Sequence, residues 1–199
     1  MNTGKSIKLS VLLICVCMSF SNAQTFENFA FDSLIGKKAI NFQAKTLDGK
    51  DFNFGNKRGK NIMLLFWSKY CGGCIKETAD LNKIIKENGQ YNFELISILD
   101  ESAEELMNTD TTQYSLRIYP NESGYYEYNR PFHGNTKIDF EIIKDGKEIR
   151  AKYGIPNTSP ITLFIDEEFI IRDYNIGYYV YANNFAKLNA KVTTLLAEK

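Results

Sequence analysis

The sequence predicts an α/β fold built on a parallel pair of buried strands, and three observations favour it. An apolar run at residues 62–67 has the length and composition of a buried strand. A helical pattern follows, in which Leu81, Ile84 and Ile85 recur at three- and four-residue spacing among polar residues. A second apolar run comes next, at residues 93–99. Strand, helix and strand in this order predict a parallel pair with a right-handed crossover.

The elements around this first strand follow from local signals. Residues 39–54 alternate in polarity around Asp48-Gly49, which is a strong hairpin signal, and a polar turn follows at 55–60. The first helix is expected from Cys74 to about Asn88, where Asn88-Gly89 provides a stop signal. An N-terminal hairpin therefore precedes the first core strand.

The second half of the chain predicts the rest of the sheet and its helices. Ser102, with Glu105 three residues on, opens a capping-box pattern for a short helix. The expected elements are a helix at 102–108, a strand at 138–143, a helical turn at 148–153, a strand entered through proline at 158–166, an antiparallel partner at 169–174, and an amphipathic helix at about 183–197.

Residues 109–136 fit none of these elements and are expected to form an insertion. The segment holds five tyrosines, Phe132 and the chain's one histidine, His133. A structureless loop of this length would be unusual, so part of it should be ordered. Its aromatic side chains either cover a core or form a surface for a partner.

The N-terminus has the pattern of an export signal. Lys5 and Lys8 form a positive start, residues 11–20 are an apolar core too short to span a membrane comfortably, and Ser21-Asn22-Ala23 offers a cleavage site. We therefore expect a signal peptide at residues 1–23, a single domain at 24–199 and export to the periplasm. An uncleaved membrane anchor and lipidation at Cys15 or Cys17 are the alternatives. The formal net charge of zero and the lack of a basic stripe argue against nucleic-acid binding.

Cysteine use indicates redox chemistry. Of the four cysteines, Cys15 and Cys17 fall inside the signal, which leaves Cys71 and Cys74. A disulfide across so short a loop constrains the unfolded chain little, so a purely stabilising role is disfavoured. A zinc site is disfavoured because zinc takes four ligands and only His133 and carboxylates remain. The head of a helix favours a thiolate, which makes Cys71 the expected nucleophile and Cys74 the resolving thiol.

On these residues the sequence resembles the thioredoxin superfamily, and within it the exported TlpA/ResA-like thiol–disulfide oxidoreductases. The similarity runs from about residue 40 to the end. Its motifs are Phe66-Trp67, Cys71-Gly72-Gly73-Cys74, Tyr153-Gly154-Ile155, Ser159-Pro160 and Leu163-Phe164-Ile165-Asp166. The resemblance implies a thioredoxin-like three-layer sandwich with a central mixed sheet, an N-terminal β-hairpin extension and an insertion before a cis-proline strand.

The sequence departs from the family pattern at three places. Tyr70 stands before the first cysteine where the family commonly has Trp, and Gly73 stands where it commonly has Pro. The span from Cys74 to Pro160 is also long, and residues 109–136 account for the excess.

The resemblance also implies roles for residues around the dithiol. It implies that Glu77 lies near the cysteines and tunes their protonation, whereas an exposed glutamate that simply suits the helix dipole is the alternative. It implies a cis bond at Pro160 and pairing of the Ser159 backbone with the substrate chain. Trp67 is expected to belong to the substrate-binding site, together with Ser159 and Pro160, and to shield Cys74, whereas an ordinary core residue is the alternative.

The expected function is exchange of electrons between the Cys71/Cys74 dithiol and protein disulfides, as a reductant, with no cofactor and no metal. The resemblance implies two partners. One is a disulfide-containing protein substrate, and the other is an upstream thiol electron donor, either soluble or bound to a membrane. One alternative is an AhpC/TSA-like peroxide reductase that forms a sulfenic acid on Cys71, although Ser68 replaces the threonine of the Thr-x-x-Cys pattern. The other is a non-catalytic metal- or partner-binding module on the same scaffold.

Overall fold

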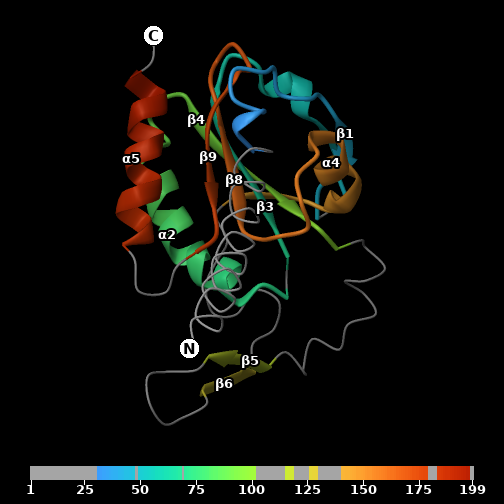
Figure 1. Cartoon of the computed structure of the whole chain (residues 1–199), viewed down its shortest axis with the longest axis vertical. Coiled ribbons are helices and arrows are strands. Elements are labelled where there is room, and N and C mark those ends of the chain that lie inside the picture. The colour runs from blue at the N-terminus through green and yellow to red at the C-terminus, as the bar shows by residue number, and fades with distance from the viewer. Residues whose placement is uncertain are drawn as a thin grey trace, which may run out of the picture. The chain divides into compact units, whose positions relative to one another are not determined.

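A five-stranded mixed sheet is the centre of the fold (Figure 1). The computed structural model describes residues 31–47, 49–68, 70–101, 115–118, 126–129, 140–178 and 183–197. The chain divides into two units, Met1–Ile35 and Gly36–Lys199, and the sheet belongs wholly to the second unit. Its strands, in spatial order, are β7 (Glu141–Ile143), β4 (Phe93–Leu99), β3 (Asn61–Trp67), β8 (Ile161–Ile165) and β9 (Ile171–Ile176).

The strand directions confirm the predicted parallel pair. Strand β4 runs parallel to β3, with Asn61 opposite Phe93 and Trp67 opposite Leu99, and β7 continues in the same direction. Strands β8 and β9 pair antiparallel at the other side of β3. Because β3 and β4 run in the same direction, their carboxyl ends meet at one edge of the sheet.

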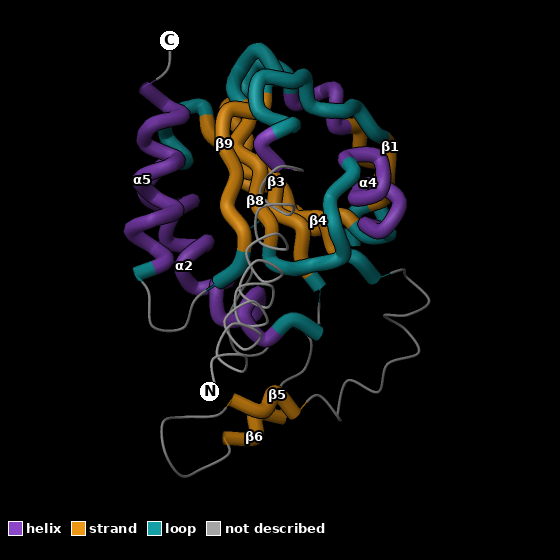
Figure 2. Tube along the Cα trace, viewed as in Figure 1, coloured by secondary structure: helices purple, strands orange, loops and turns teal. Residues whose placement is uncertain are grey.

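Helices cover both faces of the sheet, as Figures 1 and 2 show. Helices α2 (Gly72–Asn88) and α5 (Asn184–Ala197) lie on one face, and α4 (Gly146–Tyr153) lies on the other. Successive side chains of β3 point to opposite faces of the sheet. Trp67 belongs to the core cluster formed with α2 and α5, whereas the Phe66 ring meets Tyr153 of α4 at a centroid distance of 5.8 Å. The buried side chains of the α5 stripe include Leu188, Val192 and Leu195, so the predicted amphipathic helix is confirmed.

The predicted N-terminal hairpin is present and closes one edge of the sheet. Strands β1 (Gln43–Lys45) and β2 (Asp51–Asn53) pair antiparallel, and the 3₁₀ helix η1 (Phe54–Lys57) follows. Gly49 has a positive φ of 86°, which glycine adopts at no steric cost. The Leu47 N–H donates to the Ile142 carbonyl at 2.8 Å, which supplies edge strand β7 with a partner.

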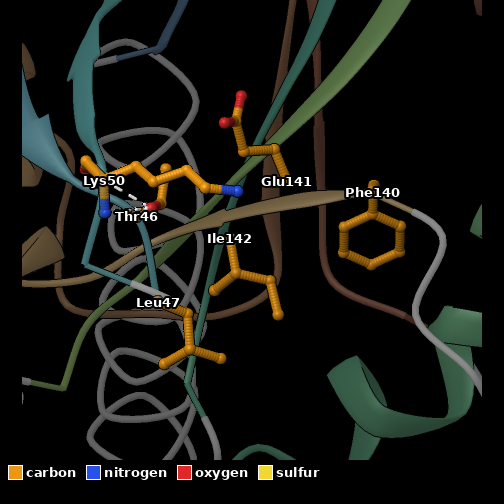
Figure 3. A pocket seen from close by; sticks show the side chains of 6 residues that line it. All are labelled: Thr46, Leu47, Lys50, Phe140, Glu141 and Ile142. Carbon is orange, nitrogen blue, oxygen red and sulfur yellow. Dashed lines mark hydrogen bonds between the residues drawn. The ribbon is translucent and has the colours of Figure 1, made fainter.

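Figure 3 shows the small pocket where this hairpin meets β7, with the Thr46 and Lys50 hydrogen bond at its rim. Six residues line the pocket: Thr46, Leu47, Lys50, Phe140, Glu141 and Ile142. At the opposite side of the sheet, Lys38 forms a bridge with Ile170 just before β9.

Several element boundaries differ from the prediction; β8, for example, was expected at 158–166 and spans Ile161–Ile165. Helix α2 begins at Gly72 and not at Cys74. Helix α4 begins at Gly146, earlier than the helical turn expected at 148–153, and it follows Asp145, whose φ of 61° is left-handed. Strand β9 begins at Ile171 and not at 169, because Phe169 has a φ of 69° and its buried ring packs 4.8 Å from that of Phe54.

Part of the expected insertion is ordered. Strands β5 (Ser115–Ile118) and β6 (Tyr126–Asn129) form an antiparallel pair inside residues 109–136. The predicted signal peptide, the predicted helix at 102–108 and His133 lie outside the described residues. Among the helices of the described residues, none combines the length and the apolar character needed to cross a membrane.

Gly146 provides a test of the packing under α4. An alanine inside a helix usually stabilises it by about 0.5–1 kcal/mol relative to glycine. At this position, however, a Cβ would lie 2.6 Å from both Ile98 Cγ2 and the Leu99 carbonyl oxygen. We expect Gly146→Ala to lower the free energy of unfolding by about 1–3 kcal/mol in urea titrations. The exposed Lys152→Ala on the same helix is the control and should stay within about 0.5 kcal/mol. An unchanged or more stable Gly146→Ala would contradict the packing described.

Candidate active site

The dithiol lies where β3 passes into α2. Cys71 is the N-cap of α2, with extended backbone at φ −89° and ψ 101°, and its Sγ accepts a hydrogen bond from the Cys74 N–H at 3.1 Å. Unpaired backbone N–H groups and the positive end of the helix dipole favour negative charge at this position. Cys71 and Cys74 form a disulfide, with their Cα atoms 5.3 Å apart. The disulfide therefore lies at the head of the helix, with Cys71 at the N-cap position.

The two sulfurs differ in access. Cys71 is partly exposed, whereas Cys74 is 2% exposed and belongs to the core cluster that also contains Trp67. A partner from solution therefore reaches Cys71 first. Trp67 is a core residue in the cluster that also contains Cys74, so it both fills the core and shields Cys74 from solvent. Contact of Trp67 with a substrate stays a prediction.

The Ser159-Pro160 segment lies against the dithiol. The peptide bond between the two residues is cis, as the resemblance implied for Pro160. The Ser159 carbonyl oxygen is 3.5 Å from Cys71 Sγ, although the two residues are 88 positions apart in the chain. The structure thus brings Cys71, Ser159 and Pro160 together, as expected for the site.

A polar cleft opens beside Cys71. It has a volume of about 500 Å³ and is lined by Ser68, Tyr70, Cys71, Asp100, Glu101, Lys147, Asn157, Thr158 and Ser159. Tyr70, which stands where the family commonly has Trp, is 68% exposed at its rim. The Ser68 hydroxyl donates to the Glu101 carboxylate, which is buried. The cleft therefore offers hydrogen-bonding groups next to the reactive sulfur.

Glu77 is buried, which excludes the alternative of an exposed first-turn glutamate. Its side chain is 0% exposed, and neither carboxyl oxygen has a hydrogen-bond partner among the described residues. Burial, with a further contribution from the charge of Asp80, raises the pKa of Glu77 from 4.5 to about 8. Glu77 lies one turn beyond Cys74 on α2, so a titratable group with a pKa near that of a thiol lies on the same helix as the resolving cysteine.

Sequence reasoning missed Tyr178, which follows β9. A Cβ on Gly73 would lie 3.5 Å from the Tyr178 Cβ, and the Tyr178 hydroxyl donates to Asp80 at 3.3 Å. Burial raises the pKa of Tyr178, and the charges of Asp80 and Glu77 add to this effect. Tyr178 therefore lies beside Gly73, the second of the two glycines between the cysteines, and binds Asp80 of α2. The available signal for this loop is Gly177, which fits the family resemblance and stands just before Tyr178.

Sequence reasoning also missed a buried ion pair between Asp100, at the end of β4, and Arg150 of α4. Arg150 Nε and one terminal nitrogen donate to the two Asp100 oxygens at 2.9 and 2.8 Å. The available signal was that Arg150, a charged residue, stands on the buried face of a short helix with Ile149 and Tyr153.

Among the described residues, no group of three or more His, Cys, Asp or Glu side chains lies close enough together to hold a metal ion.

Comparison with curated proteins finds relatives of similar length. Thiol-disulfide oxidoreductase ResA of Bacillus cereus is 27% identical over 145 residues, which cover 72% of this chain and 84% of that protein. Thioredoxin-like protein YneN of Bacillus subtilis is 27% identical over 154 residues, which cover 77% of this chain and 78% of that protein.

Solved structures share the fold at lower sequence identity. A thiol:disulfide interchange protein of the thioredoxin family from Chlorobium tepidum superposes with a TM-score of 0.58 and 18% identity, covering 81% of this chain and 97% of that one. The thioredoxin domain of a thiol-disulfide oxidoreductase from Bacteroides vulgatus gives 0.56 and 16%, covering 79% and 96%. These matches confirm the predicted thioredoxin-like fold. Residues 35–174, most of the chain, match the AhpC/TSA family, to which this protein therefore belongs.

Proposed function

We propose that this protein is an exported thiol–disulfide oxidoreductase that reduces disulfides in protein substrates. The observation that carries the proposal is the Cys71/Cys74 pair at the head of α2, with one accessible and one buried sulfur, opposite the cis Ser159-Pro160 segment. Relatives of similar length are named thiol-disulfide oxidoreductases, which supports the same reaction class.

The reaction consists of two exchanges. The Cys71 thiolate attacks one sulfur of a substrate disulfide, forms a mixed disulfide and releases the other substrate cysteine as a thiolate. The Cys74 thiolate then attacks Cys71 Sγ, forms the Cys71–Cys74 disulfide and releases the second substrate cysteine. The substrate disulfide gains two electrons, which the enzyme dithiol loses. An upstream dithiol protein, soluble or membrane-bound, restores the reduced enzyme by the reverse exchange.

Glu77 is proposed as the proton acceptor for the second exchange. Cys74 must lose its thiol proton before it can attack, and burial opposes ionisation of a thiol without a base. A carboxylate with a pKa of about 8 is a base of matched strength for a thiol, whose ordinary pKa is about 8.5. The buried position of Glu77 on the helix that carries Cys74 supports this role.

Export and the direction of electron flow belong to the proposal. The lysines, apolar run and small residues of segment 1–23 support a signal peptide, followed by one domain from residue 24. The names of the ResA relatives support disulfide exchange as the reaction, and the reductive direction rests on the family resemblance. Peroxide reduction is disfavoured because the Ser68 hydroxyl, at the place of the peroxiredoxin threonine, donates to Glu101.

Reduction of insulin disulfides in the presence of dithiothreitol tests the proposal. The protein should accelerate insulin precipitation, and Cys71→Ser should lower the rate to that of dithiothreitol alone, because no sulfur remains to attack. Cys74→Ser should accumulate a mixed disulfide with insulin, visible on non-reducing gels. Consumption of hydrogen peroxide without insulin reduction would favour the peroxidase, and inactivity in both assays would favour a non-catalytic module.

The pH dependence of mixed-disulfide release tests the role of Glu77. The wild-type rate should rise as the pH passes about 8, where Glu77 loses its proton and can accept that of Cys74. Glu77→Gln should be slower by about tenfold or more at pH 8, since it offers no base. Asp80→Asn is the matched variant: removal of its charge lowers the pKa of Glu77, so the rise should move to lower pH. A Glu77→Gln profile that superimposes on the wild type would exclude the role.

The same pKa predicts a pH-dependent stability. The folded protein keeps a proton on Glu77 up to about pH 8, whereas the unfolded chain loses it near 4.5. The protonated Glu77 therefore contributes its full stabilisation of the folded state below about pH 4.5. This contribution falls as the pH rises and is lost once the pH has passed about 8. Relative to Glu77→Gln, the wild type should therefore lose a few kcal/mol of unfolding free energy between about pH 5 and about pH 9. Urea titrations of the oxidised proteins measure this, with exposed Glu87→Gln as a control that should track the wild type.

A further inference from the structure

The buried Arg150–Asp100 pair joins α4 to the end of β4, beside the end of β3, the strand that leads to the dithiol. Arg150 is 4% exposed, and its guanidinium lies 5.4 Å from the centre of the Phe66 ring of β3. The Asp100 backbone N–H donates to the Trp67 carbonyl at 2.9 Å, at the last residue of β3. Asp100 is therefore fixed to the strand end from which the Cys71 loop starts, and it holds Arg150 by two charged hydrogen bonds.

The remaining Arg150 donors are used on the segment that precedes the cis bond. One terminal nitrogen donates to the Pro156 carbonyl at 3.0 Å and to the Thr158 carbonyl at 2.8 Å. The other donates to the Ser159 Oγ at 3.0 Å. A single side chain thus binds three of the four residues at 156–159, and the Ser159 carbonyl of this segment lies 3.5 Å from Cys71 Sγ.

Arginine is required for this arrangement, because its planar guanidinium carries five N–H donors in a fixed geometry, whereas lysine has one compact ammonium. Stability alone does not explain a buried ion pair, since well-packed apolar residues of similar volume often stabilise a core as well or better. What an apolar pair could not supply is donors for the two backbone carbonyls and the Ser159 hydroxyl, next to the polar cleft beside Cys71.

We propose that Arg150, held by Asp100, is a positioning residue for polypeptide substrates: it fixes the backbone of residues 156–159 so that the substrate chain is aligned along Ser159 while Cys71 attacks its disulfide. The inference rests on the proposed function. It concerns extended chains, which need the 156–159 backbone, more than small disulfides, which need only access to Cys71.

Steady-state kinetics with two substrates test the proposal. Insulin is the polypeptide disulfide, and dithiobis(nitrobenzoate) is a small disulfide that reports access to the dithiol. Arg150→Lys keeps a positive charge beside Asp100 but loses the planar donors. The double variant Arg150→Met/Asp100→Leu removes both charges together and so avoids an unpaired buried carboxylate. Arg172→Lys is the matched control, because Arg172 also binds a buried aspartate, Asp166, at the far end of β8 from Pro160.

We expect both Arg150 variants to raise the KM for insulin by about tenfold to a hundredfold, the upper figure being the scale on which a misplacement of about 1 Å slows a reaction, while the rate with the small disulfide changes less than about twofold. Arg172→Lys should leave the ratio of the two activities as in the wild type. Equal losses on both substrates, no change on either, or failure of both variants to fold would overturn the proposal in favour of a structural role. A wild type that reduces the small disulfide but not insulin would overturn the proposed function itself, which keeps the two failures distinct.

Discussion

The structure depends on the burial of β3 between two layers of helices. Because both faces of this strand are covered, its alternation sends Trp67 toward α2 and the core around Cys74, and Phe66 toward α4 and Arg150. The last two residues of β3 therefore contribute to two different environments, one on each face of the sheet. One is apolar and shields the resolving thiol, and the other is polar and holds the segment before the cis-proline. The accessible sulfur of Cys71 lies where they meet.

The sequence was most informative where local pattern decides structure. The apolar runs of β3 and β4, the periodicity of α2 and the Asp48-Gly49 turn predicted the parallel pair, the helix that carries the dithiol and the N-terminal hairpin. The position of Pro160 opposite the dithiol came from the family resemblance, because no local pattern relates residues so far apart in the chain.

The remaining features depend on tertiary contacts that a single sequence does not encode locally. Whether Glu77 is exposed or buried depends on the elements packed around the head of α2, and its position in the helix is the same in both cases. The Arg150–Asp100 pair joins residues fifty positions apart, and Arg150 looks like a solvated residue in a short, mostly polar helix. Phe169 departs from the predicted strand because its left-handed backbone is set by the burial of its ring against Phe54.

The N-terminal stretch has a consequence for contacts between molecules. Within the nine residues 38–46, the chain pairs with Ile170 beside one outer strand, through Lys38, and with Ile143 of the opposite outer strand, through Thr46. Open strands attract strands of other chains, because their backbone groups lack partners. At these two points, a strand of a second copy can pair with the sheet only after residues 38–46 have dissociated from it. The same short segment therefore protects both outer strands from intermolecular strand pairing.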